Sequence, residues 1–195
     1  MYVLPALLAA ALAPTASAGC GELNLQAPFQ FAQQITVKET KQASSHAPSG
    51  ASIVGLWKFQ LISQGNTNHN PPIPDGALLD FGYAEWHSDG TEIMNSGGHS
   101  PASENFCLGV WGQTGYLNFE LNHFPISYDV ASGNIANYLN LREGVTLSPS
   151  GDSYVGSFTL LIYDTKGNQL DKLVGNVAAT RLTVDSTLPS AIPTN

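Results

Sequence analysis

Basic residues are scarce in this sequence. Only 7 of its 195 residues are Lys or Arg, against 15 Asp or Glu, which gives a formal net charge of −8. A nucleic-acid-binding surface needs clustered Lys and Arg to contact phosphates, and binding to an anionic membrane surface needs them equally. The charge balance therefore disfavours both partners and favours an acidic protein that stays in solution.

Common catalytic and cofactor motifs are missing as well. The sequence has no Gly-x-Ser-x-Gly element for a serine nucleophile. It also has no glycine-rich loop between a strand and a helix that would bind nucleotide phosphates. Its 2 cysteines and 5 histidines show no Cys-x-x-Cys pair and no other spacing typical of metal ligands. These absences predict that the protein binds no cofactor and no metal.

Long apolar runs are missing too, with one exception at the N-terminus. Leu4 to Leu12 is apolar, and Ala16-Ser17-Ala18 supplies the small residues that signal peptidase requires. Residues 1–18 therefore resemble a cleavable export signal, although no Lys or Arg precedes the apolar run. This run is too short to cross a bilayer, which takes about 20 apolar residues. We expect a secreted or periplasmic protein with no membrane-spanning segment after cleavage.

Three fates are open for the first of the two cysteines, Cys20: a disulfide, a lipid anchor, or a free thiol near the terminus with Cys107 buried and inert. Cleavage after Ala18 leaves Cys20 and Cys107 in the mature chain, and an exported protein permits a disulfide between them. The segment Ser17-Ala18-Gly19-Cys20 also resembles a lipobox, and cleavage before Cys20 would anchor the protein to a membrane through a lipid. The cleavage point decides between the lipid anchor and the other two outcomes.

The mature chain divides into an arm, one domain and a tail. Residues 19–52 are rich in Gln, Ser, Ala and Thr and predict a flexible arm, and residues 186–195 predict a disordered tail. In the domain, residues 53–185, runs rich in β-branched and aromatic residues alternate with Gly, Asn, Asp and Pro. These runs predict strands at 53–63, 77–87, 91–95, 105–111, 115–124, 135–147, 154–163 and 169–184.

The order of these strands favours a barrel. No run has a helical period, whereas Leu117, Phe119, Leu121 and His123 alternate with polar residues and share one strand face. Consecutive strands with short turns favour antiparallel pairing between neighbours. Eight such strands close most simply into an all-β, up-and-down barrel, which has no free edge and can enclose one small ligand. A two-sheet sandwich is the alternative.

Two positions carry a family resemblance. Gly55-Leu56-Trp57 opens the first strand, and Arg181 lies in the last. The chain resembles in this the lipocalins and their wider calycin superfamily, whose barrel opens with Gly-x-Trp and carries a basic residue late in the barrel that packs over this Trp. A guanidinium can stack on an indole and still donate hydrogen bonds. This resemblance implies that the two residues close one end of the barrel.

Other features separate the chain from typical lipocalins. A Ser- and Pro-rich tail replaces the helix that follows their barrel, and the loop 65–76 is rich in Pro. A calycin-like barrel without the helix, or an allene-oxide-cyclase-like barrel, is therefore the better comparison. Residues 86–97 and 105–111 look like segments of exported bacterial proteins to which no activity is attached. The calycin resemblance implies a small apolar ligand in the lumen, and it implies ligand contacts from Trp57, Phe119, Leu121, Leu141, Phe158 and Arg181.

Polar residues on apolar strand faces are the candidates for chemistry. His123 lies on an otherwise apolar face, and Glu143 lies among the Leu and Val residues of its strand. A buried carboxylate is costly unless it is paired or protonated, so a cross-strand pair of His123 and Glu143 is the first candidate for catalysis. The alternative is a core histidine whose hydrogen bonds are satisfied.

Glu85 and His87 form a second candidate pair, because residues two apart share a strand face. If they face inward, the histidine has a carboxylate nearby and can act as a general base. If Trp86 faces the core, both face solvent.

The sequence thus leaves three functions open. The first is an exported protein that binds a small apolar molecule in its barrel. The second is a cofactor-free isomerase, cyclase or lyase that uses His123 and Glu143. The third is a surface interaction module with a filled barrel.

Overall fold

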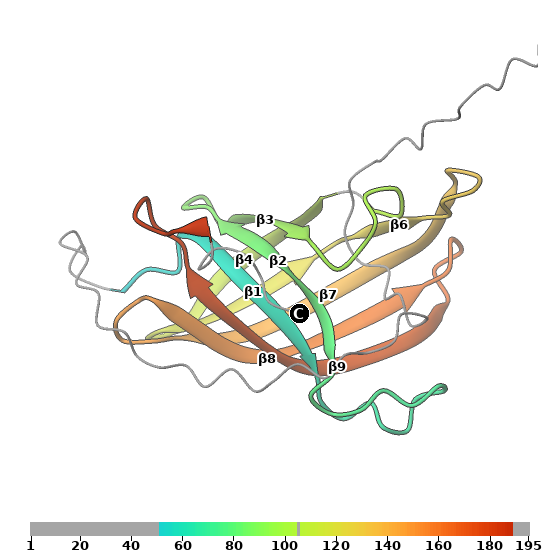
Figure 1. Ribbon diagram of the computed structural model, residues 1–195, viewed down its shortest axis with the longest axis horizontal. Coiled ribbons are helices and arrows are strands. Elements are labelled where there is room, and N and C mark those ends of the chain that lie inside the picture. The colour runs from blue at the N-terminus through green and yellow to red at the C-terminus, as the bar shows by residue number, and fades with distance from the viewer. Residues whose placement is uncertain (1–50, 105, 189–195) are drawn as a thin grey trace, which may run out of the picture.

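The computed structural model describes residues 51–104 and 106–188, which fold into a closed eight-stranded antiparallel β-barrel with one extra strand (Figure 1). The predicted barrel is confirmed, and the sandwich alternative is wrong because the sheet closes on itself. The predicted export signal, most of the predicted arm, Cys20 and the end of the tail lie outside the described residues. The strands are β1 (Gly55–Ser63), β2 (Leu78–Trp86), β3 (Thr91–Ser96), β4 (Cys107–Gly115), β5 (Asn118–His123), β6 (Ile126–Tyr128), β7 (Ile135–Leu147), β8 (Ser153–Tyr163) and β9 (Gln169–Arg181).

Two pairings close the barrel. Strands β1 to β5 follow one another as antiparallel neighbours, and so do β7 to β9. The first strand also pairs with the last, with Trp57 opposite Arg181. On the other side β5 pairs with β7, with His123 opposite Leu141. No helix in the described part of the chain is long and apolar enough to span a membrane.

The extra strand β6 was not predicted. It contains only three residues, which is too few to show an alternation of apolar and polar side chains. The long strand β7 explains its position: residues 141–146 pair with β5, and residues 135–138 continue beyond β5 and pair with β6 instead. The hairpin of β6 and β7 therefore extends from the barrel wall.

Alternate side chains of each strand fill the lumen. In β7 the inward residues are Leu139, Leu141, Glu143, Val145 and Leu147, none of which is more than 5% exposed. Because the two faces of a strand alternate, the residues between them face outward. The burial of the apolar side chains among them stabilises the fold by roughly 25 cal/mol for each Å² of apolar surface removed from water.

Aromatic residues pack one end of the lumen, where β1 begins and β9 ends. We call this the Arg181 end. The rings of Trp57 and Tyr154 lie 4.9 Å apart, and Trp86 contacts both Tyr154 at 5.8 Å and Trp111 at 5.6 Å. The guanidinium of Arg181 stacks on Trp57, with 4.1 Å between its Cζ and the ring centroid. The arrangement that the Gly-x-Trp resemblance implied is therefore present.

The glycine of this motif has a physical role. Gly55 has a φ of 138°, a backbone conformation that residues with a Cβ rarely adopt. A Cβ at this position would also lie 2.5 Å from Nη1 of Arg181. The glycine therefore leaves room for the guanidinium over Trp57.

Glycines also allow neighbouring strands to pack closely, and Gly175 in β9 shows this best. A Cβ at Gly175 would lie 2.1 Å from the backbone oxygen of Ile62 and 2.7 Å from the ring of Phe158. We expect Gly175→Ala to destabilise the fold by about 2–3 kcal/mol, because neither the backbone nor the buried ring can move freely. Urea unfolding followed by tryptophan fluorescence measures this. Gly144→Ala is the control, since a Cβ there meets nothing within 4 Å; equal losses in both variants would contradict the expectation.

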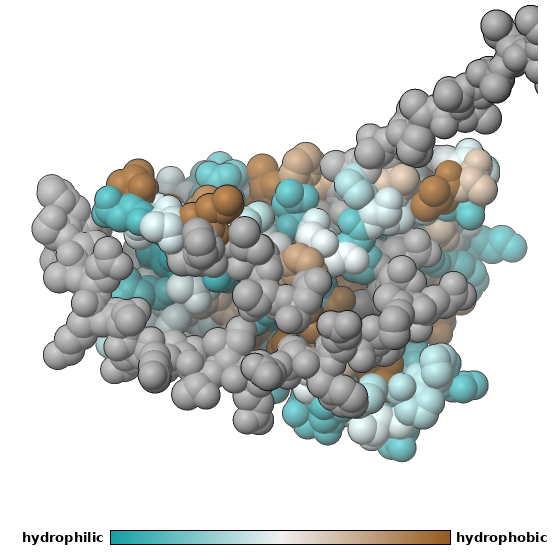
Figure 2. Space-filling view, in the orientation of Figure 1, coloured by the Kyte–Doolittle hydropathy of each residue, from teal (hydrophilic) through white to brown (hydrophobic). Residues whose placement is uncertain are grey.

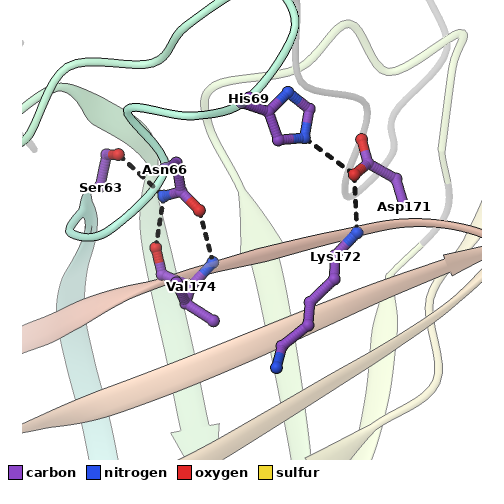
Figure 3. A network of polar contacts seen from close by, with 6 residues as sticks. All are labelled: Ser63, Asn66, His69, Asp171, Lys172 and Val174. Carbon is purple, nitrogen blue, oxygen red and sulfur yellow. Dashed lines mark hydrogen bonds and ion pairs between the residues drawn. The ribbon is translucent and has the colours of Figure 1, made fainter.

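At the opposite end, which we call the Asp80 end, the loop of residues 64–77 projects from the barrel with a hydrophilic surface (Figures 1 and 2). Asn66 anchors it to β9 in the manner of a strand: its side chain donates to the oxygen of Val174 at 2.6 Å and accepts from the nitrogen of Val174 at 3.0 Å (Figure 3). His69 contacts Asp171 at 2.8 Å, also on β9. The proline-rich loop is therefore fixed against one side of this end.

Candidate functional site

A small cavity lies inside the barrel toward the Asp80 end. Its volume is about 30 Å³, which is room for roughly two water molecules. Ten of its twelve lining residues are apolar, and the other two, Asp80 and His99, are ionisable. The full lining is Leu61, Leu79, Asp80, Met94, His99, Cys107, Pro125, Leu139, Leu141, Phe158, Leu160 and Leu173.

Asp80 organises the rim of this cavity. One oxygen, Oδ1, accepts hydrogen bonds from the hydroxyl of Ser96 at 2.6 Å and from the backbone nitrogens of Phe81 at 2.7 Å and Gly98 at 3.2 Å. Burial nevertheless raises the pKa of Asp80 to about 6. His99 Nε2 lies 4.0 Å from the same oxygen, and burial lowers the pKa of His99 to about 4. At neutral pH the rim thus holds a neutral imidazole beside a mostly ionised carboxylate.

The residue segment after β3 brings His99 into the cavity wall. This segment, residues 97–104, starts at β2, where the nitrogen of Gly97 donates to the oxygen of Phe81, and ends on the β6 hairpin, where Glu104 pairs with Ser127 and the nitrogen of Tyr128 donates to the oxygen of Ser103 at 2.6 Å. Anchoring at both ends keeps the imidazole 3% exposed.

A second polar group lies deeper in the lumen. His123 of β5 is fully buried, and its Nδ1 lies 3.2 Å from Oε2 of Glu92, a β3 residue that is 1% exposed. Gly109 of β4 lies between them in the sheet, opposite both residues, and a Cβ there would lie 2.9 Å from the Glu92 carboxylate. The glycine therefore creates the space in which the carboxylate reaches the histidine. Burial lowers the pKa of His123 to about 3, so its imidazole is neutral.

Glu143 of β7 faces the same region from the opposite side of β5. On one side Glu143 pairs with Leu121 of β5, which lies two residues before His123 and on the same inward face. On the other side it pairs with Phe158 of β8. Glu143 is 3% exposed, and neither of its oxygens has a hydrogen-bond partner among the described residues. Burial raises its pKa to about 8, so the carboxyl group is predominantly protonated at neutral pH. Its charge and that of Glu92 add to burial in raising the pKa of Tyr154.

The cavity is adjacent to the polar layer formed by Glu92, His123 and Glu143. Leu141 and Phe158 line the cavity, and they are the direct cross-strand neighbours of His123 and Glu143 respectively. Met94 also lines the cavity and lies on the same face of β3 as Glu92, two residues further on. A molecule in the cavity therefore has the polar layer at its inner end.

The structure places the predicted catalytic residues as follows. His123 and Glu143 both point inward, as predicted from their apolar strand faces. However, the carboxylate that contacts His123 belongs to Glu92. Glu143 lies diagonally from His123 across the β5–β7 pair. The predicted direct pairing is replaced by a layer in which three polar residues share the lumen.

The predicted ligand contacts fall into three groups. Leu141 and Phe158 line the cavity, while Phe119 and Leu121 are buried in the lumen outside its lining. Trp57 and Arg181 close the far end of the barrel. The six residues therefore share the interior of the barrel but not one pocket.

Glu85 and His87 do not face the lumen. Trp86 between them is 1% exposed, so the two polar residues point outward by strand alternation. On the barrel exterior, His87 Nε2 lies 3.6 Å from Glu85 Oε1, and 58% of the Glu85 side chain is exposed. The inward interpretation of this pair is therefore wrong. Cys107 is buried in β4 and lines the cavity, and its predicted disulfide stays a prediction because Cys20 lies outside the described residues.

Glu92, Asp80 and His99 were missed as site residues. For Glu92 a signal existed, since Glu92 shares one strand face with Met94 and Ser96. For Asp80 the signal was ambiguous, because both of its neighbours, Leu79 and Phe81, are apolar. His99 lies outside any strand, and the chain fold alone brings it to the cavity.

Exposed apolar side chains gather on the outside of β4 and beside its partner. Phe106, Leu108, Val110 and Phe124 are each more than half exposed, and the nitrogen of Phe124 donates to the oxygen of Leu108. An exterior apolar patch is a feature of interaction modules, which was the third of the functions considered.

Comparison of the chain with protein-family models, with curated proteins and with solved structures finds no match. Among the described residues, no group of three or more His, Cys, Asp or Glu is arranged to hold a metal ion.

Proposed function

We propose that this chain is an exported protein that binds a small, largely apolar molecule in the lumen of its barrel. The observation that carries the proposal is the cavity with ten apolar lining residues and two polar residues, Asp80 and His99, at its rim. Ligand sites typically combine an apolar wall with a few polar groups that fix orientation. The calycin resemblance of Gly55-x-Trp57 and Arg181 supports the same function.

Binding requires the lining side chains to move. The present volume of about 30 Å³ holds only a few non-hydrogen atoms. Met94 is the side chain best able to yield space, because a thioether has several rotatable bonds and packs adaptably. The molecule enters from the Asp80 end, since the aromatic cluster and Arg181 close the other end.

The test is uptake of the neutral apolar dye N-phenylnaphthylamine, followed by its fluorescence. We expect saturable binding of one dye per chain. Leu173→Phe, which puts a larger side chain into the cavity wall, should weaken dye binding by about tenfold or more, equivalent to ~1.4 kcal/mol.

Leu170→Phe is the matched control, because Leu170 lies on the same strand but is 60% exposed. It should bind the dye as the wild-type chain does. Absence of saturable dye binding by the wild-type chain would contradict the proposal, and so would equal losses in the two variants.

A further inference from the structure

Two buried polar side chains, Glu143 and His123, lie next to cavity-lining residues, because their cross-strand neighbours Phe158 and Leu141 line the cavity. Both oxygens of Glu143 and Nε2 of His123 make no hydrogen bond with the described residues. A buried polar group without a partner costs about 1–3 kcal/mol. Their burial, at 3% and 0% exposure, rules out compensation by bulk solvent. Both groups are therefore positioned to bind a group that enters the lumen.

The spacing of the two residues suits a single small polar group. Glu143 lies diagonally to His123 across the β5–β7 pair, and residues in this relation are about 7–8 Å apart. A separation of this size is long enough for one oxygen atom between the two side chains to make a hydrogen bond of about 2.8 Å to each. The flanking wall, Leu141 and Phe158, is apolar and belongs to the cavity.

The chemistry of the two side chains selects the group. A protonated carboxyl offers one O–H donor and one carbonyl acceptor, and a neutral imidazole Nε2 is either a donor or an acceptor, depending on its tautomer. With the proton on Nδ1, beside Oε2 of Glu92, Nε2 accepts. A hydroxyl group, which both donates and accepts, satisfies both side chains in either tautomer. Where Nε2 is the acceptor, a ketone or an ether cannot satisfy it because neither can donate, and a carboxylate would place a charge in a buried apolar surrounding.

We propose that Glu143 and His123 form a subsite for the hydroxyl group of an apolar alcohol, whose hydrocarbon part occupies the cavity. This inference rests on the proposed function and adds the ligand class to it. Glu92 lies beside the other ring nitrogen of His123, with 3.2 Å between Oε2 and Nδ1.

The experiment is displacement of N-phenylnaphthylamine by two isomers, n-octanol and heptyl methyl ether. They contain the same atoms but differ in the hydroxyl group. We expect the wild-type chain to bind the alcohol about tenfold more tightly, which is the effect of one hydrogen bond of ~1.4 kcal/mol. Glu143→Leu and His123→Leu should reduce this preference to less than about twofold while affinity for the ether is kept.

Two variants separate hydroxyl recognition from a structural role. Glu143→Gln should keep most of the preference, because a neutral amide also donates and accepts. Glu120→Leu should keep all of it, because Glu120 lies on the outer face of β5. Near-ultraviolet circular dichroism checks that each variant is folded, and His123→Phe, whose ring has no hydrogen-bonding atom, replaces His123→Leu if the latter is not.

The outcomes distinguish the two proposals. If neither isomer displaces the dye, or no dye binds, the proposed function is wrong. If both isomers displace the dye equally, the binding function stands and the hydroxyl subsite is wrong. The subsite is also wrong if the preference survives in both leucine variants.

Discussion

At pH 9 the Glu143→Gln variant is expected to be more stable than the wild-type protein, and at pH 4 the two should be nearly equal. Burial raises the pKa of Glu143 from an ordinary value of 4.5 to about 8. A change of this size corresponds to about 5 kcal/mol of free energy of unfolding once the group is ionised in both states. Glutamine has the same shape and no charge, so the variant does not incur this cost.

The sign follows from proton binding. Between pH 4.5 and about pH 8 the folded protein keeps the Glu143 proton, whereas the unfolded chain has released it. The folded state then binds one proton more, so the free energy of unfolding falls as the pH rises. The stability associated with the neutral carboxyl is complete below pH 4.5 and is lost as the pH rises through 8.

Three other buried groups act at lower pH. Asp80, with its pKa raised to about 6, gives a slope of the same sign that ends near pH 6. His99 and His123, with their pKa values lowered to about 4 and 3, give the opposite slope, which ends near their ordinary value of 6.5. Above pH 6.5 Glu143 is therefore the one of these four that still titrates.

Urea unfolding of the wild-type and variant proteins between pH 6.5 and 9 measures the effect. The wild-type protein should lose about 1.4 kcal/mol per pH unit up to pH 8 relative to Glu143→Gln. Glu120→Gln, a substitution on the outer face of β5, should follow the wild-type profile. Parallel profiles for the wild-type protein and Glu143→Gln would show that Glu143 does not titrate in this range.

This cost bears on the function. A leucine at position 143 would extend the apolar face of β7, which already contains Leu141 and Val145. The carboxyl instead removes stability as the pH rises and has no partner among the described residues. A residue that weakens the fold in this way is typical of a ligand or catalytic site, which is why the hydroxyl subsite is placed there.

The strands were predictable from the sequence because they depend on local patterns. Alternation such as Phe158, Leu160 and Ile162 in β8, bounded by turn residues, marks a strand before any partner is known. The closure of the barrel followed from the number and order of strands. The three-residue β6 did not, because its existence depends on how far β7 extends beyond β5.

The site was predictable only in part. His123 and Glu143 were identified because each interrupts an apolar face. Their partners depend on distances across the sheet that sequence spacing does not encode: Glu92 reaches His123 over Gly109, two strands away. The interior position of His99 depends on the path of a loop. Local patterns therefore indicated which face carries the polar residues, and the register of the strands determined which residues meet.

At the Arg181 end of the barrel, replacement of Arg181 itself is expected to cause the largest loss of stability. Its guanidinium donates to the backbone oxygens of Gly151 at 2.6 Å and Val54 at 2.8 Å, and to that of Ser52, while stacking on Trp57. These bonds join the segment before β1 to the turn before β8. Hydrogen bonds from a charged donor contribute about 1.5–3 kcal/mol each, and the stacking contact adds about 1 kcal/mol.

We expect Arg181→Leu to lower the free energy of unfolding by about 3–5 kcal/mol, since the bonds share one partly exposed side chain and are not additive. Arg181→Lys should recover less than half of this loss, because an ammonium cannot donate in three directions within one plane while it stacks on an indole. Arg142→Leu is the control: Arg142 is exposed on the outer face of β7, and its replacement should change stability by no more than about 0.5 kcal/mol.

A double-mutant cycle with Gly55→Ala tests whether the guanidinium is the cause. The Cβ of alanine would lie 2.5 Å from Nη1 of Arg181, so part of the cost of Gly55→Ala arises from displacing the guanidinium. This part disappears when Arg181 is already leucine, whereas the strain of the positive φ remains. We therefore expect Gly55→Ala to cost about 1 kcal/mol less in the Arg181→Leu background. Additive losses would mean that Gly55 is required only for its backbone conformation. The contact between β1 and β9 at this end would then depend on Trp57 and Arg181 and not on the glycine.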